Sequence, residues 1–326
     1  MSDILSLAAD TLISPIILSF ALGLLAALFR SELTVPEAVA KAMSIYLLFA
    51  IGFKGGVSVS ESGLTSVLVW AIIAGFVLSA VMPLLAFGLL QAFTRLDRIN
   101  AAAIAAHYGS ISIVTFVTAT SVLERQGISS EGFMVAVAAV MEAPAILTAL
   151  YLVFKSPDQK GTMDSDLWRE ILLNGSIVLL VGAFFIGAIT GTEGLAQIES
   201  FIVAPFTGVL CLFLLDMGLV AGRGLRNARG DIGLPLFAFS LVMPLLGATL
   251  GLGVGWAIGL STGGVALLMT LAASASYIAV PAAMRVALPD ANPSLYLTCS
   301  LGFTFPFNLT VGIPIFVATA TAILGT

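Results

Sequence analysis

The string Val-Met-Pro-Leu-Leu occurs twice in the chain, at residues 81–85 and again at residues 242–246. Each copy lies inside a long apolar segment, and other short strings recur around it in the same order. A unit with an odd number of membrane spans must face opposite ways in its two copies. The repeat therefore predicts two halves that are inverted relative to each other in a bilayer, an arrangement typical of secondary transporters.

The composition of the chain requires a membrane environment. Hydrophobic residues make up 59% and charged residues 10%, whereas a soluble domain has roughly 25% charged residues. A helical span needs about 20 apolar residues, and the apolar segments lack the strict alternation of barrel strands. We therefore expect ten spans, at about residues 11–29, 36–53, 64–92, 99–124, 131–154, 169–190, 200–222, 234–260, 261–288 and 294–324.

The predicted fold is an all-α integral membrane protein of ten transmembrane helices, built as a 5+5 inverted repeat with two broken crossing helices. The polar segment at residues 155–166 joins the halves, which gives one repeat at 1–156 and the other at 157–326. Three further pairs of strings support this division: 48–52 opposite 214–218, 106–110 opposite 272–276, and 141–144 opposite 303–306.

The distribution of basic residues predicts the orientation of the chain. With the N-terminus outside, the inner loops hold all but two of the 13 Lys and Arg residues, and only Lys54 and Arg125 lie outside. This bias is typical of cytoplasmic loops. We expect a multi-pass protein of the plasma (inner) membrane with both termini outside and with its first apolar segment retained as a span. The net charge of −5 and the lack of a basic run argue against a nucleic-acid partner.

The fourth and ninth spans contain residues that interrupt helices near the middle of the membrane. The fourth contains Gly109, Ser110, Ile111 and Ser112, and the ninth contains Ser274, Ala275, Ser276 and Tyr277 shortly before Pro281. Serine hydroxyls compete for backbone hydrogen bonds, and proline lacks an N–H group. Breaks at matching depths in two halves indicate a transporter site, because the free N–H groups of the next half-helix attract anions. The alternative is that these residues only pack or kink the helices.

Charged residues deep in the spans are few. Glu142 lies in the fifth span, where a carboxylate costs about 2.5–3.5 kcal/mol. We interpret it as a partner of a coupling cation, the alternative being a structural acid bonded to backbone. No Lys or Arg lies at the centre of a span, so a bound anion would need helix ends, hydroxyls and a co-bound Na⁺ or H⁺ to balance its charge.

Other polar residues in the spans have more than one interpretation. Asp216 and Arg223 are seven residues apart on one helix and are predicted to form a local ion pair. His107, the only histidine, is interpreted as a packing residue. Asn308 and Thr310 lie close to Pro306 and either line the site or cap a local break.

Four strings together resemble the sodium-dependent bicarbonate transporter family, whose best-known members are cyanobacterial importers. They are AHYGSISIVTF (106–116), EAPAILTAL (142–150), AASASYIAVPAAMR (272–285) and PDANPSLYLTCSLGFTFPFNLTVGIPIF (289–316). The resemblance covers the whole chain and implies sodium-driven uptake of bicarbonate by a homotrimer in the lipid bilayer. It also implies a moving core of spans 3–5 and 8–10 (about 64–154 and 234–326) and a gate or scaffold of spans 1–2 and 6–7 (about 11–53 and 169–222).

The resemblance also implies positions for the ligands. The anion would lie between residues 109–112 and 274–277, with sodium near Ser112, Thr115, Glu142, Asn308 and Thr310. Sodium would be the coupling ion, with no other metal and no cofactor, and a PII-like regulatory protein would bind the inner face. The best-known members have Ser-Ser-Asp-Ile-Ser-Gly at residues 275–280, so Tyr277 replaces an acid here and leaves the cation and the substrate open.

Three other functions remain to be weighed against a bicarbonate symporter. A channel is possible, but inverted repeats with broken helices favour alternating access. A cation-coupled transporter of another small organic anion would use the same donor groups. An intramembrane enzyme would need paired acids, a Ser/His pair or a metal cluster, and Glu142 and Asp216 are the only deep acids. They lie on spans assigned to different bundles. The sequence therefore favours a transporter over an enzyme.

Overall fold

The computed structural model describes residues 13–63, 65–154, 173, 175–227 and 233–325, and every regular element in these ranges is a helix. Eight helical stretches of the described residues are long and apolar enough to cross a membrane, and two shorter apolar helices accompany them. The protein is thus an all-helical, multi-pass membrane protein, while the count of ten spans stays a prediction. The junction predicted at 155–166 lies outside the described residues.

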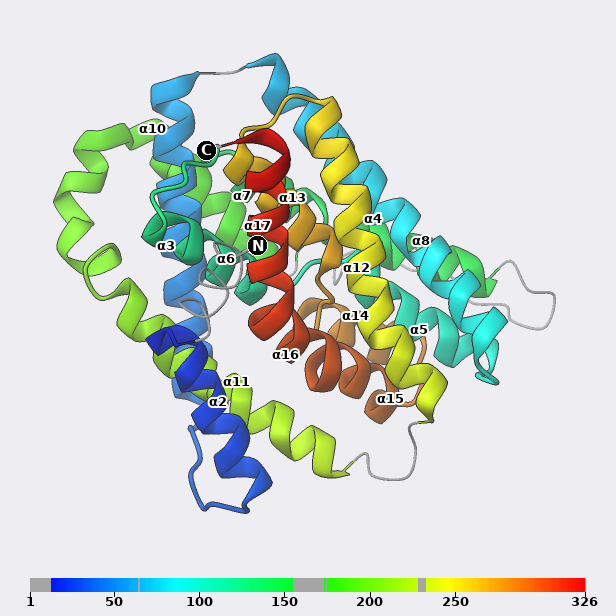
Figure 1. Cartoon of the computed structure of the whole chain (residues 1–326). Coiled ribbons are helices and arrows are strands. Elements are labelled where there is room, and N and C mark those ends of the chain that lie inside the picture. The colour runs from blue at the N-terminus through cyan, green and yellow to red at the C-terminus, as the bar shows by residue number, and fades with distance from the viewer. Residues whose placement is uncertain (1–12, 64, 155–172, 174, 228–232, 326) are drawn as a thin grey trace.

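Four helices form one side of the molecule, on the left in Figure 1. Helix α2 (Pro15–Leu28) packs along α11 (Phe206–Asn227), and α3 (Glu37–Ser62) packs along α10 (Gly175–Ile202). Glycines allow the close approach: a Cβ atom on Gly23 would collide with the Leu215 carbonyl, and one on Gly56 with the Phe184 carbonyl. Small residues at such contacts let membrane helices bring their backbones together.

The opposite side contains α4 (Ser66–Phe93), α5 (Arg98–Gly109), α8 (Ala143–Phe154) and α12 (Leu234–Ala257) (Figure 1). Helix α4 packs against α5 and α8, and α12 packs against α13 (Thr262–Ala273). Gly247 and Gly251 of α12 lie against the α13 backbone, where a Cβ atom would collide with the carbonyls of Ala272 and Leu268. This glycine stripe is a helix–helix contact.

Helix α5 begins with a side-chain cap at the surface. The Asp97 carboxylate accepts a hydrogen bond from the Asn100 N–H group (2.9 Å), and the Asn100 side-chain oxygen accepts one from the Asn292 N–H group (2.7 Å). Burial raises the pKa of Asp97, but its hydrogen bonds outweigh this effect and place the pKa below the ordinary value. The cap thus ties the start of α5 to the start of α15 (Pro293–Leu297).

Both segments expected to be broken are interrupted. Residues 110–112 separate α5 from α6 (Ile113–Arg125), and residues 274–278 separate α13 from α14 (Ala279–Ala287). Pro281 acts differently from the expectation that it disrupts a preceding turn. It lies in the first turn of α14, where a missing N–H group breaks no helical hydrogen bond.

Two further segments depart from a continuous α-helix: the fifth, where the sequence predicted no break, and the last, where a local break beside Pro306 was one of two interpretations. Residues 141–142 separate α7 (Met134–Val140) from α8, and Pro144 is the second residue of α8. The last segment continues from α15 through the π-helical turn η1 (Thr298–Thr304), α16 (Phe305–Phe307), a second π-helical turn, η2 (Asn308–Gly312), and α17 (Ile313–Leu324). Such turns are rare and occur often at functional sites.

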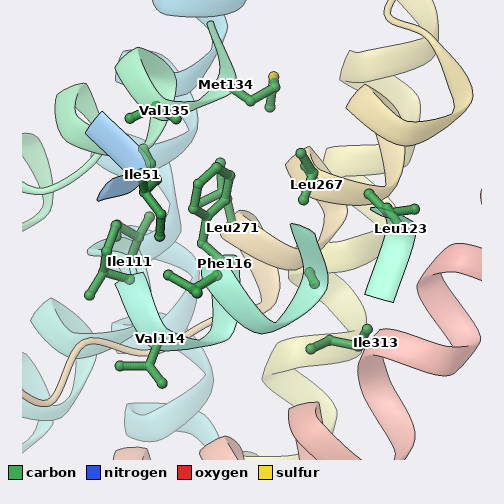
Figure 2. Close-up of a cluster of buried hydrophobic side chains, with 14 of the residues drawn as sticks. Ile51, Ile111, Val114, Phe116, Leu123, Met134, Val135, Leu267, Leu271 and Ile313 are labelled. Atoms are coloured by element: carbon green, nitrogen blue, oxygen red, sulfur yellow. The ribbon is translucent and has the colours of Figure 1, made fainter. Parts of the chain in front are cut away.

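Helices α6, α7, α13 and α17 lie between the two sides (Figure 1). Figure 2 shows part of the buried apolar cluster around α6, to which Ile51 of α3, Leu267 of α13 and Ile313 of α17 contribute. The apolar central part of the Arg98–Arg125 segment is buried throughout. The fourth segment is therefore surrounded by protein, which positions its interruption in the interior of the molecule.

Candidate functional site

The interruptions of the fourth and ninth segments contact each other. The Ser112 N–H group donates to the Ser274 hydroxyl (3.0 Å), and the Ser276 N–H group donates to the His107 carbonyl (2.8 Å). Ser110 and Ser274 each follow the last residue of a helix with an extended backbone. The two breaks thus have the same construction, and hydrogen bonds between the halves hold them together.

The half-helices that follow the breaks begin differently. The Ser112 hydroxyl caps α6 by accepting from the Thr115 N–H group (3.2 Å). Helix α14 follows Ile278, which supplies no side-chain cap. The first N–H groups of α14 therefore lack a side-chain acceptor, which makes this helix end the better partner for an anion.

A small pocket, called here the central pocket, lies where the two breaks meet. Its free volume is about 10 Å³, which is close to what one water molecule needs. An anion with three oxygen atoms therefore requires the pocket to open. Its lining comes from both breaks, from the α7–α8 interruption and from the start of α10: Ile111, Ser112, Ile113, Glu142, Ser176, Ser276, Tyr277, Ile278 and Ala279.

Several buried polar atoms at the breaks have no hydrogen-bond partner within the described part of the chain. They are Ser110 Oγ, Glu142 Oε2, Tyr277 Oη and Asn308 Oδ1. The Tyr277 hydroxyl lies near Ser112 but does not reach hydrogen-bond geometry. Buried polar groups are nearly always paired, so the two of these residues that line the central pocket, Glu142 and Tyr277, indicate a place for polar ligands there.

Glu142 is held at the α7–α8 interruption by a serine from α4. The Ser79 hydroxyl donates to the Met141 carbonyl (2.6 Å) and accepts from the Ala145 N–H group (3.2 Å). Glu142 is 6% exposed, and no Lys or Arg of the described residues forms an ion pair with it. A buried carboxylate without a fixed cation needs a proton or a mobile cation.

The other predicted cation-binding residues, apart from Ser112, are absent from the lining of the pocket that holds this carboxylate. The Thr115 hydroxyl donates to the Ser112 hydroxyl (2.9 Å) at the start of α6. The Asn308 side-chain N–H donates to the carbonyl of Ala273 (2.8 Å), the last residue of α13. The Thr310 hydroxyl donates to the Pro306 carbonyl within its own helix (2.8 Å). Asn308 therefore caps a break, and Thr310 is absent from the lining of the central pocket.

Among the predicted anion-binding residues, Ile111, Ser112, Ser276 and Tyr277 line the central pocket. The remaining four, Gly109, Ser110, Ser274 and Ala275, are buried but are absent from the lining of this pocket. A Cβ atom on Gly109 would collide with Pro83 and Ala145. This contact explains the choice of glycine at the end of α5.

Two interpretations of single residues have opposite outcomes. His107 bonds through Nδ1 to the Ala103 carbonyl (2.6 Å) and stacks on the Tyr296 ring, as a packing residue does, but its Nε2 atom is buried without a hydrogen-bond partner among the described residues. The predicted pair of Asp216 and Arg223 does not form a direct ion-pair contact, although the charge of Arg223 still acts on Asp216. Arg223 instead donates to the Leu33 carbonyl (2.9 Å).

Sequence reasoning missed Ser79, although a signal for it exists. Serine precedes the proline of the repeated string by four residues in both halves, as Ser79 and Ser240. The Ser240 carbonyl accepts a hydrogen bond from Thr304 (2.7 Å), and Thr304 is the residue opposite Glu142 in the repeat. Both serines therefore bond to the fifth or tenth segment at the same position of the repeat, Ser79 through its hydroxyl beside Glu142 and Ser240 through its carbonyl at Thr304.

Apolar helices on every side of a shared interior site, where interrupted helices leave donors and a carboxylate unpaired, define a membrane transport protein. The family model of the Na⁺-dependent bicarbonate transporter superfamily matches residues 15–321. This match covers nearly the whole chain, so the chain belongs to that superfamily, as the resemblance implied. Membership places it among transporters rather than enzymes. A comparison with curated proteins found no match.

Proposed function

We propose that the protein is a secondary active transporter that imports bicarbonate together with sodium by alternating access. The observation that carries this proposal is the central pocket, which joins the breaks of both halves to the carboxylate of Glu142. Family membership supports the same substrates. Sodium is the coupling ion and a transported substrate, and the proposal includes no resident cofactor.

The anion would bind between residues 109–112 and 274–277. The uncapped N-terminus of α14 supplies N–H groups and the positive end of a helix dipole. The hydroxyls of Ser112, Ser276 and Tyr277 add donors to the same pocket. These groups replace part of the water that bicarbonate loses, without a fixed positive charge beside it.

The missing positive charge would come from sodium. A carboxylate, hydroxyls and backbone carbonyls are the ligands that hard cations prefer. Glu142 and Ser112 provide the first two in the central pocket, with Thr115 hydrogen-bonded to Ser112. Bound together, the anion and the cation stabilise each other, and this mutual dependence is the physical basis of symport.

The helix contacts support an inverted repeat and a moving core. Helices α2, α3, α4 and α5 of repeat 1–156 correspond in order to α10, α11, α12 and α13 of repeat 157–326. The α2–α11 contact therefore has its counterpart in the α10–α3 contact, and the α4–α5 contact has its counterpart in the α12–α13 contact. In the proposed motion, spans 3–5 and 8–10 move against spans 1–2 and 6–7. The distribution of basic residues puts both termini outside the plasma membrane. By family resemblance the unit is a homotrimer, and a PII-like protein binds its inner face.

Uptake by purified protein in liposomes tests the proposal. Labelled bicarbonate should accumulate under an inward sodium gradient and should not accumulate when potassium replaces sodium. Ser276→Ala should raise the KM for bicarbonate about tenfold, the effect of roughly 1.4 kcal/mol for a lost hydrogen bond. Ser240→Ala is the matched control, because the Ser240 hydroxyl bonds within its own helix. Equal uptake in sodium and potassium contradicts the coupling.

A second candidate substrate is another small organic anion. Tyr277 stands where the best-known relatives carry an acid, and its phenol makes one wall of the central pocket less polar. Counterflow of labelled bicarbonate against acetate or pyruvate separates the two. Bicarbonate alone should drive exchange, and stronger exchange with an organic acid would reassign the substrate.

A further inference from the structure

A second, larger pocket lies beyond the apolar layer next to the central pocket. Its free volume is about 190 Å³, and it lies between α3 and α6, with walls from α7, α11 and α13. It is called here the Lys54 pocket. The lining residues that matter below are Ile51, Lys54, Phe116, Thr120, Glu124 and Glu131.

Lys54 has one ionic partner in this pocket. Its ammonium group lies 2.9 Å from the Glu124 carboxylate, and the two side chains are 34% and 52% exposed. The second carboxylate, Glu131, accepts hydrogen bonds from the N–H group and the hydroxyl of Ser261 (2.7 and 2.9 Å) at the start of α13. Glu124 is therefore the resident counter-ion of Lys54, whereas Glu131 is satisfied by a helix end.

The ion pair is of a kind that an incoming anion can replace. Exposed pairs contribute little net stability, because water solvates both charges well when they separate. The Lys54 ammonium also lies 5.7 Å from the centre of the Phe206 ring, so an aromatic face supports the cation while it changes partners. The lining carries two carboxylates, Glu124 and Glu131, against one ammonium group, so an anion can bind here only at Lys54 and only by taking the place of Glu124.

Helix α6 connects the two pockets. Ser112 and Ile113 at its start line the central pocket, and Phe116, Thr120 and Glu124 along one face line the Lys54 pocket. Ile51 and Phe116 are buried and belong to the apolar cluster of Figure 2. This layer separates the pockets by about one helical turn of α6.

We propose that the Lys54 pocket is the outer capture site for the transported anion, a small monovalent oxyanion that displaces Glu124 from Lys54 before it passes to the central pocket. The inference rests on the proposed function and on the charge bias that puts Lys54 outside. A competing explanation treats the pair only as a latch between α3 and α6. The two differ in what each neutral variant does.

Initial rates of labelled bicarbonate uptake at low ionic strength separate them. Lys54→Gln should raise KM about three- to tenfold with little change in kcat, because a single charge steers the anion. Glu124→Gln should lower KM, because it removes the competitor, and Lys54→Arg should keep the wild-type value. The capture site would be overturned, and the latch supported, if KM moved in the same direction in both neutral variants. An unchanged KM in Lys54→Gln would have the same meaning. Unfolding temperatures check that the variants are folded.

A labelling experiment separates failure of the capture site from failure of the proposed function. Bicarbonate should protect Lys54 of the wild-type protein from an amine-reactive ester, measured by mass spectrometry of the labelled peptides. Lys41, exposed on the same helix, is the internal control and should stay reactive. Protection without uptake would refute the transport proposal and leave an anion site. Uptake with Lys54 unprotected would refute the capture site alone.

Discussion

Glu142 is a buried carboxylate at a helix interruption, where no basic side chain of the described residues pairs with it. If sodium is its partner, the neutral isostere in Glu142→Gln removes the charge and keeps the shape. Uptake by this variant should need at least about ten times more sodium for half-saturation, because the site has lost its charged ligand. A sodium titration of uptake measures this, and a wild-type curve would reject the coupling role.

For single residues, the local sequence predicts which side chains are unusual but not which groups they contact. The Ser and Gly residues of the two breaks and the deep Glu142 could be found because such residues are costly in apolar spans. The Asp216–Arg223 pair failed, because helical spacing shows only that two side chains share a face. Arg223 found a carbonyl on another helix instead, at Leu33. The bridge made by Ser79 likewise depends on the packing of α4 against α8.

Helix pairs of the molecule are held at glycine contacts, and these contacts predict a large difference between two similar substitutions. Gly56→Ala puts a methyl group against the Phe184 carbonyl and should destabilise the α3–α10 pair by about 1–3 kcal/mol. Gly88→Ala in α4 meets no atom within 4 Å and should be neutral or stabilising, because glycine is a poor helix former. Thermal unfolding in detergent measures both, and equal unfolding temperatures would contradict this account of the packing.

The elements were predictable to different degrees. Apolar length and the Gly and Ser clusters located the helices and the two breaks, because both signals are local. The Met141–Glu142 interruption and the π-helical turns were missed. Their backbone groups are stabilised by partners from elsewhere, such as Ser79 at the first. Pro144 was the one local sign of that interruption.

If spans 3–5 and 8–10 move against spans 1–2 and 6–7 during transport, we expect a covalent link between the two groups to stop uptake. Gly55 of α3 lies beside Val135 of α7, and a Cβ atom on Gly55 would be 2.9 Å from that of Val135. This is clearly closer than the roughly 3.8 Å of a disulfide, so the two backbones must move apart by about 1 Å when the bond forms. The double variant Gly55→Cys, Val135→Cys should lose uptake on oxidation and regain it on reduction. Its background lacks the two native cysteines, and each single variant serves as control. Full uptake by the oxidised protein would exclude relative motion at this contact.

The complete burial of the fourth segment has a consequence for how the protein is made. The 18-residue window that represents Arg98–Arg125 has a mean hydropathy of 1.4, the lowest among the eight candidate spans of the described residues, whereas that of its neighbour Ser66–Phe93 has the highest, 2.4. The hydrocarbon core of the bilayer therefore favours insertion of the fourth segment only weakly during synthesis. We therefore expect Ser66–Phe93 to insert first and to offer Arg98–Arg125 a protein surface through the contact of α4 with α5, so that membrane insertion follows the order of synthesis.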